Sequence, residues 1–343
     1  MKTITMAIIG YGKSATRYHI PYIQKLNLFE IKYIYDNNYV SNQEDFYFVD
    51  NLEVILNDKD VSLVSICTPP STHFDLAKQC IMHGKNVIIE KPFCSNVQQA
   101  HDLLELAKEY HVIALPFQNR RYDSDYLTLK EVLKYEYVGK PVELESHTDY
   151  FRPNSEIKIG TKENGMFYGL AVHSIDQIIS LFGKPNYVYY DIRNIQNHES
   201  HIDDYYDVQF FYDSLKVILK SSQLVATAYP KFILHGTQGS YIKYEADQQE
   251  NDLKIGKMPT DIGFGEDVSQ QYGHIKYQNI SHDWIEKTIP SILGGYEKYY
   301  QAIYNTIINK VSPFISDEEI LTTMEILEMG LKADGPTVLC LKK

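Results

Sequence analysis

The sequence predicts an α/β protein of two domains, a parallel sheet flanked by helices followed by a domain with a mostly antiparallel sheet. Short apolar strands alternate with helical segments in the first third of the chain, and strands follow one another after about residue 120. The length of 343 residues exceeds what one core normally organises. We therefore predict domains at residues 1–120 and 121–343.

The first third contains five apolar, β-branched segments that we expect as strands, at residues 3–9, 30–35, 61–67, 86–90 and 112–117. Segments with helical spacing lie between them, at 14–26, 51–56, 71–83 and 96–110. This alternation is typical of a doubly wound parallel sheet with helices on both faces. The segment 61–67 is apolar almost throughout, which fits a strand buried on both sides.

The second part is expected to begin with a helix at 124–135, a long strand at 142–151 and a helix at 166–182. Further strands are expected at 187–195, 205–212, 215–224, 232–235 and 240–244, and the tight turns between them favour antiparallel pairing. Residues 245–283 are polar and glycine-rich, and we expect an irregular excursion there. Helices at 295–309 and 316–332 and a strand at 337–341 complete the chain, with Ser316 and Glu319 forming a capping box.

Composition excludes some classes of protein. The net charge of −12 argues against a nucleic-acid partner, which requires a basic face. No apolar run approaches the length that spans a bilayer, and the first residues enter a strand without a signal peptide. The four cysteines have no metal-ligand spacing, and the histidines and acids suggest no metal site. We therefore expect a cytoplasmic protein with reduced thiols.

The first predicted strand ends in Gly10-Tyr11-Gly12-Lys13-Ser14-Ala15, a G-x-G-x-x-A pattern that opens the first helix. Gly10 permits a tight turn, Gly12 lets the backbone approach a pyrophosphate, and Ala15 permits close helix–strand packing. The free N–H groups at the helix start then hold phosphates. The alternative is a purely structural glycine turn, but the strand before and the helix after favour dinucleotide binding.

Asp36 stands at the end of the second predicted strand. A carboxylate there accepts hydrogen bonds from both hydroxyls of an adenine ribose and repels a 2′-phosphate. No arginine follows Asp36, so the sequence favours NAD over NADP, with NADP still possible. The alternative is that Asp36 only caps a turn.

Two later strand ends are more specific, Cys67-Thr68-Pro69-Pro70-Ser71-Thr72-His73 and Glu90-Lys91-Pro92. With the glycine loop, and with Asn119-Arg120-Arg121 and His173-Ser174-Ile175-Asp176-Gln177, they resemble the Gfo/Idh/MocA oxidoreductases over nearly the whole chain. The later stretches look most like the branch that contains the scyllo-inositol dehydrogenases. The resemblance implies an N-terminal Rossmann domain, a C-terminal α/β domain with a large, mostly antiparallel open sheet, a homodimer or homotetramer formed through that sheet, and an active site between the domains.

Lys91 is the first catalytic candidate. Hydride transfer from a secondary alcohol needs one group to take the hydroxyl proton and another to stabilise the developing alkoxide. A lysine partly desolvated beside a cationic nicotinamide can take part, because its pKa is lowered. In the family this lysine contacts substrate and nicotinamide, and the Glu90-Lys91-Pro92 motif is intact here. The alternative is an ordinary surface lysine.

His173 lies on a predicted helix, where a lone histidine is more often a packed core residue than a catalyst. The resemblance implies that it is the acid/base of the reaction. Relatives with polyol dehydrogenase activity usually carry Asp four residues earlier, where this chain has Gly169. Asp176 lies three residues after His173 on the same helix face, and we expect that it could replace the missing carboxylate. A solvated or capping role is its alternative.

The remaining site residues rest on the resemblance. Those expected to contact the cofactor are Gly10, Tyr11, Gly12, Lys13, Ser14, Asp36, Thr68, Pro69, His73, Glu90, Lys91 and Asn119. Those expected to contact the substrate are Arg120, Arg121, Arg152 and His173, although the arginines fit inter-domain ion pairs equally well.

The sequence thus favours an NAD(P)-dependent dehydrogenase or reductase acting on the CH–OH group of a cyclitol, sugar or related polyol. Two alternatives stay open. One is a dinucleotide-binding regulator without turnover, which Gly169 favours and the intact Lys91 and His173 oppose. The other is a reductase of different chemistry on the same scaffold, acting on an unsaturated or imine-like substrate.

Overall fold

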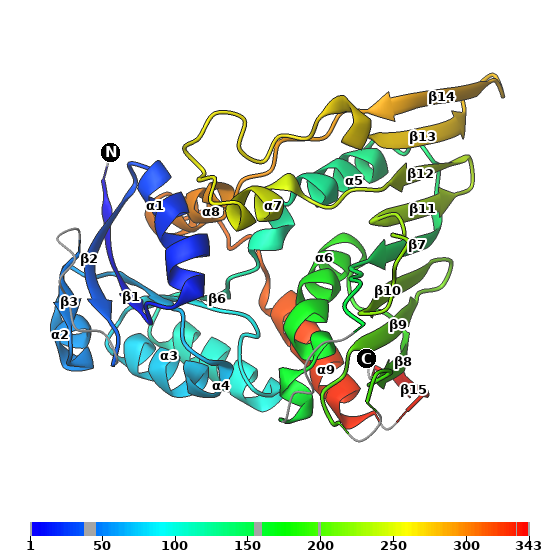
Figure 1. Ribbon diagram of the computed structural model, residues 1–343. Helices are drawn as coiled ribbons and strands as arrows, with labels where there is room; N and C mark the ends of the chain where they lie inside the picture. The colour runs from blue at the N-terminus through cyan, green and yellow to red at the C-terminus, as the bar shows by residue number, and fades with distance from the viewer. Residues whose placement is uncertain (1, 38–45, 154–159, 198–199, 334, 342–343) are drawn as a thin grey trace. The chain divides into compact units, whose positions relative to one another are not determined.

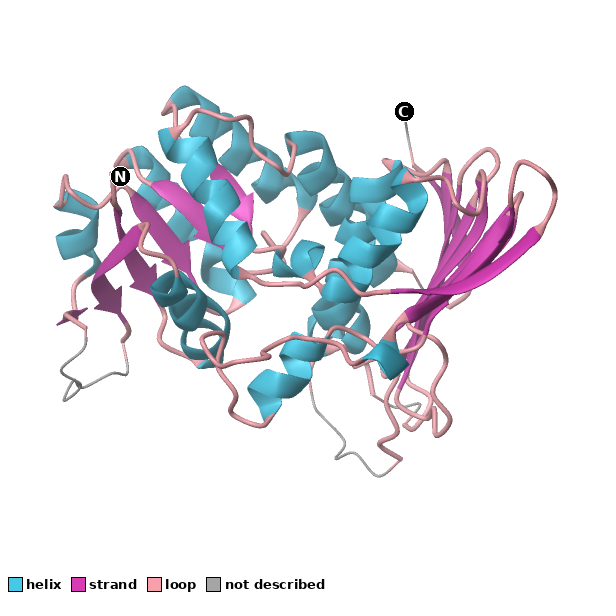
Figure 2. Ribbon diagram, turned by 90° about the horizontal axis from the view of Figure 1, so that it is seen from above, coloured by secondary structure: helices cyan, strands magenta, loops and turns pink. Residues whose placement is uncertain are grey.

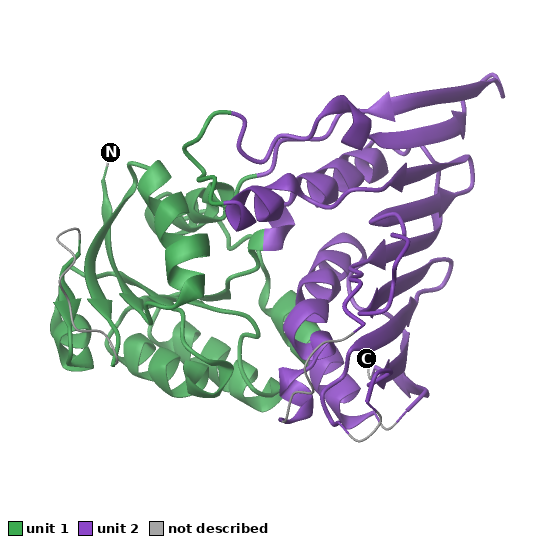
Figure 3. Cartoon of the chain, viewed as in Figure 1, with its two compact units in different colours: residues 1–119, 256–262, 295–324 green, residues 120–255, 263–294, 325–343 purple. Residues whose placement is uncertain are grey.

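The computed structural model describes residues 2–37, 46–153, 160–197, 200–333 and 335–341. The chain forms two compact units, coloured separately in Figure 3. Unit 1 comprises residues 1–119, 256–262 and 295–324, and unit 2 comprises residues 120–255, 263–294 and 325–343. Because the chain passes between the units several times, each unit is assembled from segments that are distant in sequence.

Unit 1 contains a six-stranded parallel sheet with the order β3-β2-β1-β4-β5-β6. Its strands are β1 (Ile4–Ile9), β2 (Phe29–Tyr35), β3 (Phe48–Val49), β4 (Leu63–Ile66), β5 (Asn86–Ile89) and β6 (Ala114–Pro116). The five predicted strands are confirmed, whereas the two-residue edge strand β3 was not predicted. The strand order reverses between β1 and β4, and ligands of such sheets bind outside the carboxyl ends of the strands at that point.

The helices of unit 1 lie on both sides of this sheet (Figure 1). They are η1 (Ala15–His19), α1 (Ile20–Lys25), α2 (Leu52–Asn57), α3 (His73–Met82), α4 (Val97–Glu109) and α8 (Glu297–Ile308). The predicted helix at 14–26 is not one regular helix, because η1 is a π-helical turn that continues into α1. The other helices lie close to their predicted positions, so the doubly wound arrangement is confirmed.

Unit 2 contains a nine-stranded sheet with the order β14-β13-β12-β11-β7-β10-β9-β8-β15. Its strands are β7 (Pro141–His147), β8 (Tyr187–Arg193), β9 (Tyr205–Phe211), β10 (Lys216–Ser222), β11 (Phe232–Gly236), β12 (Gly239–Lys243), β13 (Gly273–Gln278), β14 (Trp284–Ile289) and β15 (Thr337–Cys340). Only β7 and β10 pair in parallel. The predicted large, mostly antiparallel sheet is therefore confirmed.

One face of this sheet is covered by helices of unit 2, as Figure 2 shows. These helices are η3 (Asn119–Tyr122), α5 (Ser124–Lys134), η5 (Phe167–Ala171), α6 (Val172–Phe182), α7 (Gln248–Lys254) and the end of α9 (Asp317–Lys332). Side chains alternate between buried and accessible along the strands, so that Val208 and Phe210 are fully buried while their neighbours are not. The capping box at the start of α9 is present, since Glu319 N–H donates to Ser316 Oγ at 3.2 Å and Ser316 N–H to Glu319 Oε2 at 2.7 Å.

Two expectations for unit 2 are wrong. Residues 245–283 are not an irregular excursion, because they contain α7, the short helix η6 (Ser269–Gln271) and the strand β13, which pairs with β14. The strand expected over 142–151 ends at His147, and only an isolated bridge from Phe151 to Leu224 follows. Both strands of the β13–β14 hairpin carry many polar, exposed residues, so an apolar pattern does not identify them.

Candidate functional site

The glycine loop of unit 1 forms a tight turn at the carboxyl end of β1. Gly10 has φ of +94°, and a Cβ atom there would lie 2.7 Å from the carbonyl oxygen of Cys67 on the neighbouring strand. A Cβ atom on Gly12 would meet no atom within 4 Å. Gly10 is therefore required by the protein itself, whereas Gly12 leaves open space beside the backbone. This arrangement fits the approach of a pyrophosphate.

A cavity of about 500 Å³ opens beside this loop. Gly10, Gly12, Asp36, Thr68 and Pro69 line it, together with residues at the start of α3. These five residues were all expected as cofactor contacts, and the structure brings them together. Such a volume, with a carboxylate at one side and a glycine turn at the other, matches the dimensions and polarity of a nucleotide site.

Asp36 is tied to the glycine loop, because Tyr11 N–H donates to Asp36 Oδ2 at 2.8 Å. This bond fixes the carboxylate at the mouth of the cavity, at the end of β2. The segment after Asn37 lies outside the described residues. Lys13 is exposed and Ser14 half-buried at the start of the helix that follows the turn.

His73, another expected cofactor contact, does not line this cavity. It is fully buried at the start of α3, with Nδ1 2.9 Å from the carbonyl oxygen of Pro92 and Nε2 2.9 Å from that of Thr68. Burial lowers the pKa of His73. The side chain thus connects two strand ends of the site instead of lining the cavity. Asn119 is also buried, at the start of η3.

Glu90 and Lys91 follow directly after β5. The Glu90 carboxylate accepts hydrogen bonds from Ser14 Oγ, from Lys91 N–H at 3.1 Å and from His19 Nε2 at 3.0 Å. Burial alone would raise the pKa of Glu90, but the hydrogen bond and positive charge of His19, the Ser14 hydrogen bond and the charge of Lys91 lower it to about 2. Lys91 is half-buried, and its peptide bond to Pro92 is cis. Glu90 is therefore an anion that joins the glycine loop to the Lys91 backbone.

Sequence reasoning missed His19 and its partner Tyr300. His19 is fully buried at the end of the π-helical turn η1, and its Nδ1 lies 2.5 Å from Tyr300 Oη on α8. The two residues are 281 positions apart, so no local pattern connects them. A polar residue on the otherwise apolar face of the first helix was the one available signal.

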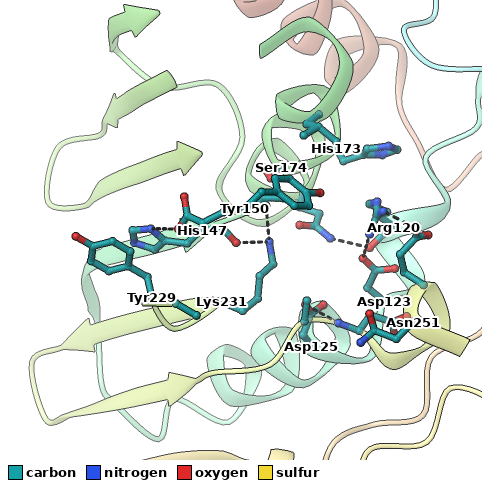
Figure 4. Close-up of a pocket in the computed structure, with 18 of the residues that line it drawn as sticks. Arg120, Asp123, Asp125, His147, Tyr150, His173, Ser174, Tyr229, Lys231 and Asn251 are labelled. Carbon is teal, nitrogen blue, oxygen red and sulfur yellow. Dashed lines mark hydrogen bonds and ion pairs between the residues drawn. The ribbon is translucent and has the colours of Figure 1, made fainter. Parts of the chain in front are cut away.

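Unit 2 contains a cavity of about 280 Å³ between α5, α6, α7 and the sheet (Figure 4). His173 and Ser174 on α6 face it from one side, and His147 at the end of β7, with Tyr229 and Lys231 in the segment before β11, face it from another. Arg120 completes the wall beside Asp123, to which its Nη1 donates at 3.3 Å. Of the predicted substrate residues, this cavity therefore brings together His173 and Arg120.

The charges of this cavity are strongly perturbed. Burial lowers the pKa of Lys231, against the opposing field of Asp125. Burial also raises the pKa of Asp125, and it raises that of Asp247, beside Asp125, to about 6. Lys231 Nζ donates to His147 O at 3.2 Å and to the hydroxyls of Ser146 and Thr148 at 3.3 Å. Titratable groups with shifted pKa values in a concave site are typical of a functional pocket. Sequence reasoning did not single out Lys231 or Asp125.

Arg121 and Asp176 form a buried ion pair away from the cavity wall. Arg121 Nε donates to Asp176 Oδ2 and Nη2 to Oδ1, each at 2.7 Å. The side chains are 9% and 3% exposed. Each carboxylate oxygen of Asp176 therefore accepts a guanidinium bond from Arg121.

Gly169 and Arg152 line a second cavity of unit 2, of about 530 Å³, which does not include His173. Gly169 lies in the π-helical turn η5, which precedes α6, and a Cβ atom there would meet nothing within 4 Å. Arg152 is exposed and lies over the Tyr150 ring at 4.3 Å. Gly169, four residues before His173, thus borders a different cavity from His173.

Within the described ranges, no group of three His, Cys, Asp or Glu side chains is arranged to hold a metal ion. No helix among the described residues is long and apolar enough to cross a membrane.

Known proteins that resemble this chain are oxidoreductases. The family model for an oxidoreductase NAD-binding Rossmann fold matches residues 4–117, and the model for the C-terminal α/β domain of the same family matches residues 130–338. The oxidoreductase YhhX of Escherichia coli is 42% identical, over 99% of both chains. The crystal structure of an oxidoreductase from Bacillus cereus is 47% identical, covers 99% of both chains and has a TM-score of 0.97. The scyllo-inositol 2-dehydrogenase (NADP(+)) IolW of Bacillus subtilis is 31% identical, over 96% of this chain and 94% of its own.

The fold and the glycine-turn cavity thus define a nicotinamide-dinucleotide-binding oxidoreductase. Both matched models and the full-length relatives place the chain in one group of these proteins. The chain belongs to the Gfo/Idh/MocA oxidoreductase family.

Proposed function

We propose that the protein transfers hydride between a nicotinamide cofactor and the CH–OH or C=O carbon of a cyclitol, sugar or related polyol. The observation that carries this proposal is the unit 1 cavity, where Gly12 leaves room for a pyrophosphate and Lys91 follows a neighbouring strand end. A nicotinamide dinucleotide held there supplies the hydride acceptor or donor at its C4 atom. The named activity of the relative IolW supports the substrate class.

Within this proposal Lys91 polarises the substrate oxygen and assists its proton, because it is a half-buried cation held by the backbone bond to Glu90. His173 takes the hydroxyl proton in oxidation and returns it in reduction, since it faces the unit 2 cavity together with other polar groups. Arg120 binds substrate hydroxyls from the same cavity. Arg121 and Asp176 are proposed as a structural pair that supports the α6 helix.

We propose NAD as the preferred cofactor. In this proposal the Asp36 carboxylate, which is fixed by Tyr11 N–H, accepts hydrogen bonds from the hydroxyls of the adenine ribose and repels a 2′-phosphate. The relative IolW is named for NADP(+), so NADP is tested alongside. We further propose a cytoplasmic protein that forms homodimers or homotetramers through the unit 2 sheet, where Val142, Tyr187 and Val338 are exposed.

A second function has one specific observation in its favour. Gly169 replaces the carboxylate usual in polyol dehydrogenases, and Asp176 is engaged by Arg121. A dinucleotide-binding regulator without turnover, or a reductase of an unsaturated or imine-like substrate, does not need that carboxylate.

The experiment that decides among these functions is a spectrophotometric scan for reduction of NAD and of NADP with inositols, sugars and sugar acids, and for the reverse reaction with the ketones. Turnover on a polyol that is lost in Lys91→Ala supports the dehydrogenase. Cofactor binding with no turnover in either direction supports the regulator. Turnover confined to unsaturated or imine substrates supports the other reductase.

A further inference from the structure

The start of the first helix in unit 1 contains an unusual turn. Residues Ala15–His19 form a π-helical turn immediately after the glycine loop, and α1 continues from Ile20. Such turns are rare and frequently mark functional sites. The turn leaves the His19 ring fully buried and stacked on Phe117, with 3.9 Å between ring centroids. The side chain is therefore held in one orientation between the sheet and α8.

The hydrogen bonds of His19 show that Nε2 carries a proton. The Glu90 carboxylate only accepts hydrogen bonds, so His19 Nε2 carries the proton that is donated to Glu90 Oε1 at 3.0 Å. Burial raises the pKa of Tyr300 well above its ordinary value, so this phenol keeps its proton. The Tyr300 hydroxyl lies 2.5 Å from His19 Nδ1, so hydrogen bonds on both ring nitrogens hold the imidazole between Tyr300 and Glu90.

Glu90 connects His19 to the proposed cofactor site. Its Oε1 accepts from Ser14 in the helix start after the glycine loop, and its Oε2 accepts from Lys91 N–H. One carboxylate thus fixes both the phosphate-binding turn and the backbone of the proposed catalytic lysine.

Further groups act on this carboxylate from the neighbouring elements: the Lys91 ammonium, the buried Cys67 thiol after β4, His73 on α3 and the Tyr300 phenol on α8. Lys91 is the cation of this set, while burial raises the pKa of Cys67 and lowers that of His73. In their neutral forms Cys67 and His73 contribute little to stabilising the negative charge of Glu90. His19 therefore supplies the main hydrogen bond that stabilises the anion inside the protein.

We propose that His19 is a positioning residue whose bond to Glu90 holds the glycine loop and Lys91 together for nicotinamide binding and hydride transfer. The role of His19 in hydride transfer rests on the proposed function. Its role in nicotinamide binding rests only on the cavity of unit 1. Without the His19 donor, Glu90 is a largely buried carboxylate that takes up a proton at a higher pH. Protonated Glu90 then holds Ser14 and Lys91 less tightly, so NAD binding and turnover both decrease at low pH, which we call the acid limb of the pH profile.

The test compares two replacements of similar size. In His19→Gln the amide nitrogen takes the place of Nε2 and can donate to Glu90, whereas in His19→Asn the shorter amide takes the place of Nδ1 and cannot. The exposed His101 on α4 gives a matched control, His101→Asn. NAD binding is measured by titration calorimetry between pH 5 and 9, and the pH profile of kcat is measured on any substrate that the scan identifies.

We expect His19→Asn to bind NAD about 10-fold more weakly below about pH 6, where the unmodified protein and His101→Asn show little change. The kcat profile of His19→Asn gains the same acid limb, and His19→Gln restores most of both properties. If His19→Asn does not fold, Tyr300→Phe is used, which removes the hydrogen-bond partner of Nδ1 and is expected to move both profiles in the same direction by a smaller amount.

Equal losses in His19→Asn and His19→Gln at every pH, with no acid limb, would overturn the inference and leave His19 as a packing residue. Absence of turnover in the unmodified protein would instead count against the dehydrogenase. In that case the pH dependence of NAD binding still decides the role of His19.

Discussion

Asp176 is buried in an ion pair with Arg121. A substitution of Asp176 therefore tests whether this carboxylate has a structural role or a catalytic role beside His173. We consider the substitution Asp176→Asn. It removes the negative charge from a site where the two side chains are 9% and 3% exposed and are joined by two bonds of 2.7 Å. Removing one member of a buried ion pair costs about 3–5 kcal/mol, because the other charge is left uncompensated. For a unit of this size the unfolding midpoint should fall by about 6–20 °C.

The assay is thermal unfolding followed by circular dichroism, with urea unfolding for the free energy and the kcat pH profile at a temperature where the variant is folded. The matched control is Glu286→Gln, because Glu286 pairs with Lys276 on the exposed β13–β14 hairpin and its loss should cost less than about 1 kcal/mol. The double variant Arg121→Met/Asp176→Leu should recover much of the lost stability, since an apolar pair can replace a buried ion pair. Unchanged stability in Asp176→Asn, with a shifted pH profile, would refute the structural role and make Asp176 a partner of His173.

Three further predictions test the individual sites. Gly12→Val should keep the fold but lose NAD binding by calorimetry, because its side chain would fill the open space proposed for the pyrophosphate; normal NAD binding by this variant would contradict the prediction. Gly10→Ala should lower the unfolding midpoint, because its Cβ atom would clash with the carbonyl oxygen of Cys67. Asp36→Ser should raise KM for NAD about 10-fold and improve the use of NADP, while an unaltered preference would mean that Asp36 only holds the loop. Burial raises the pKa of Asp203 to about 7 from an ordinary 3.8, so the folded state holds this proton more tightly than the unfolded state. The free energy of unfolding should therefore fall by about 2–4 kcal/mol as pH rises from about 4 to 7. Asp203→Asn should flatten that slope in urea unfolding, and a slope that persists would exclude Asp203 as its source.

Local patterns predicted much of the fold. The strands of unit 1 are apolar and bounded by turn residues, and the glycine loop has its strand and helix in the expected order, so these features were found from the sequence. The hairpin of β13 and β14 was missed because its side chains are largely polar and exposed. The π-helical turns at 15–19 and 167–171 were expected as ordinary helix, because an inserted residue does not change the apolar pattern enough to be recognised.

The candidate site was predictable only where a motif is continuous in sequence. Glu90 and Lys91 were identified from their motif, but the partners of Glu90 on η1 and, beyond them, on α8 come from distant segments. Arg121 and Asp176 are 55 residues apart, so their pairing depends on how η3 packs against α6. Lys231 was missed because a single lysine before a strand has no distinctive local pattern.

The most direct test of the proposed hydride transfer uses a polyol deuterated at the carbinol carbon, with NAD and the unmodified protein. We expect the reduced cofactor to contain the deuterium by mass spectrometry and turnover to be slower than with the protium substrate. Lys91→Ala should form reduced cofactor at a strongly decreased rate while still binding NAD. Reduced cofactor without deuterium, or bound NAD that no polyol reduces, would rule out direct hydride transfer from a polyol.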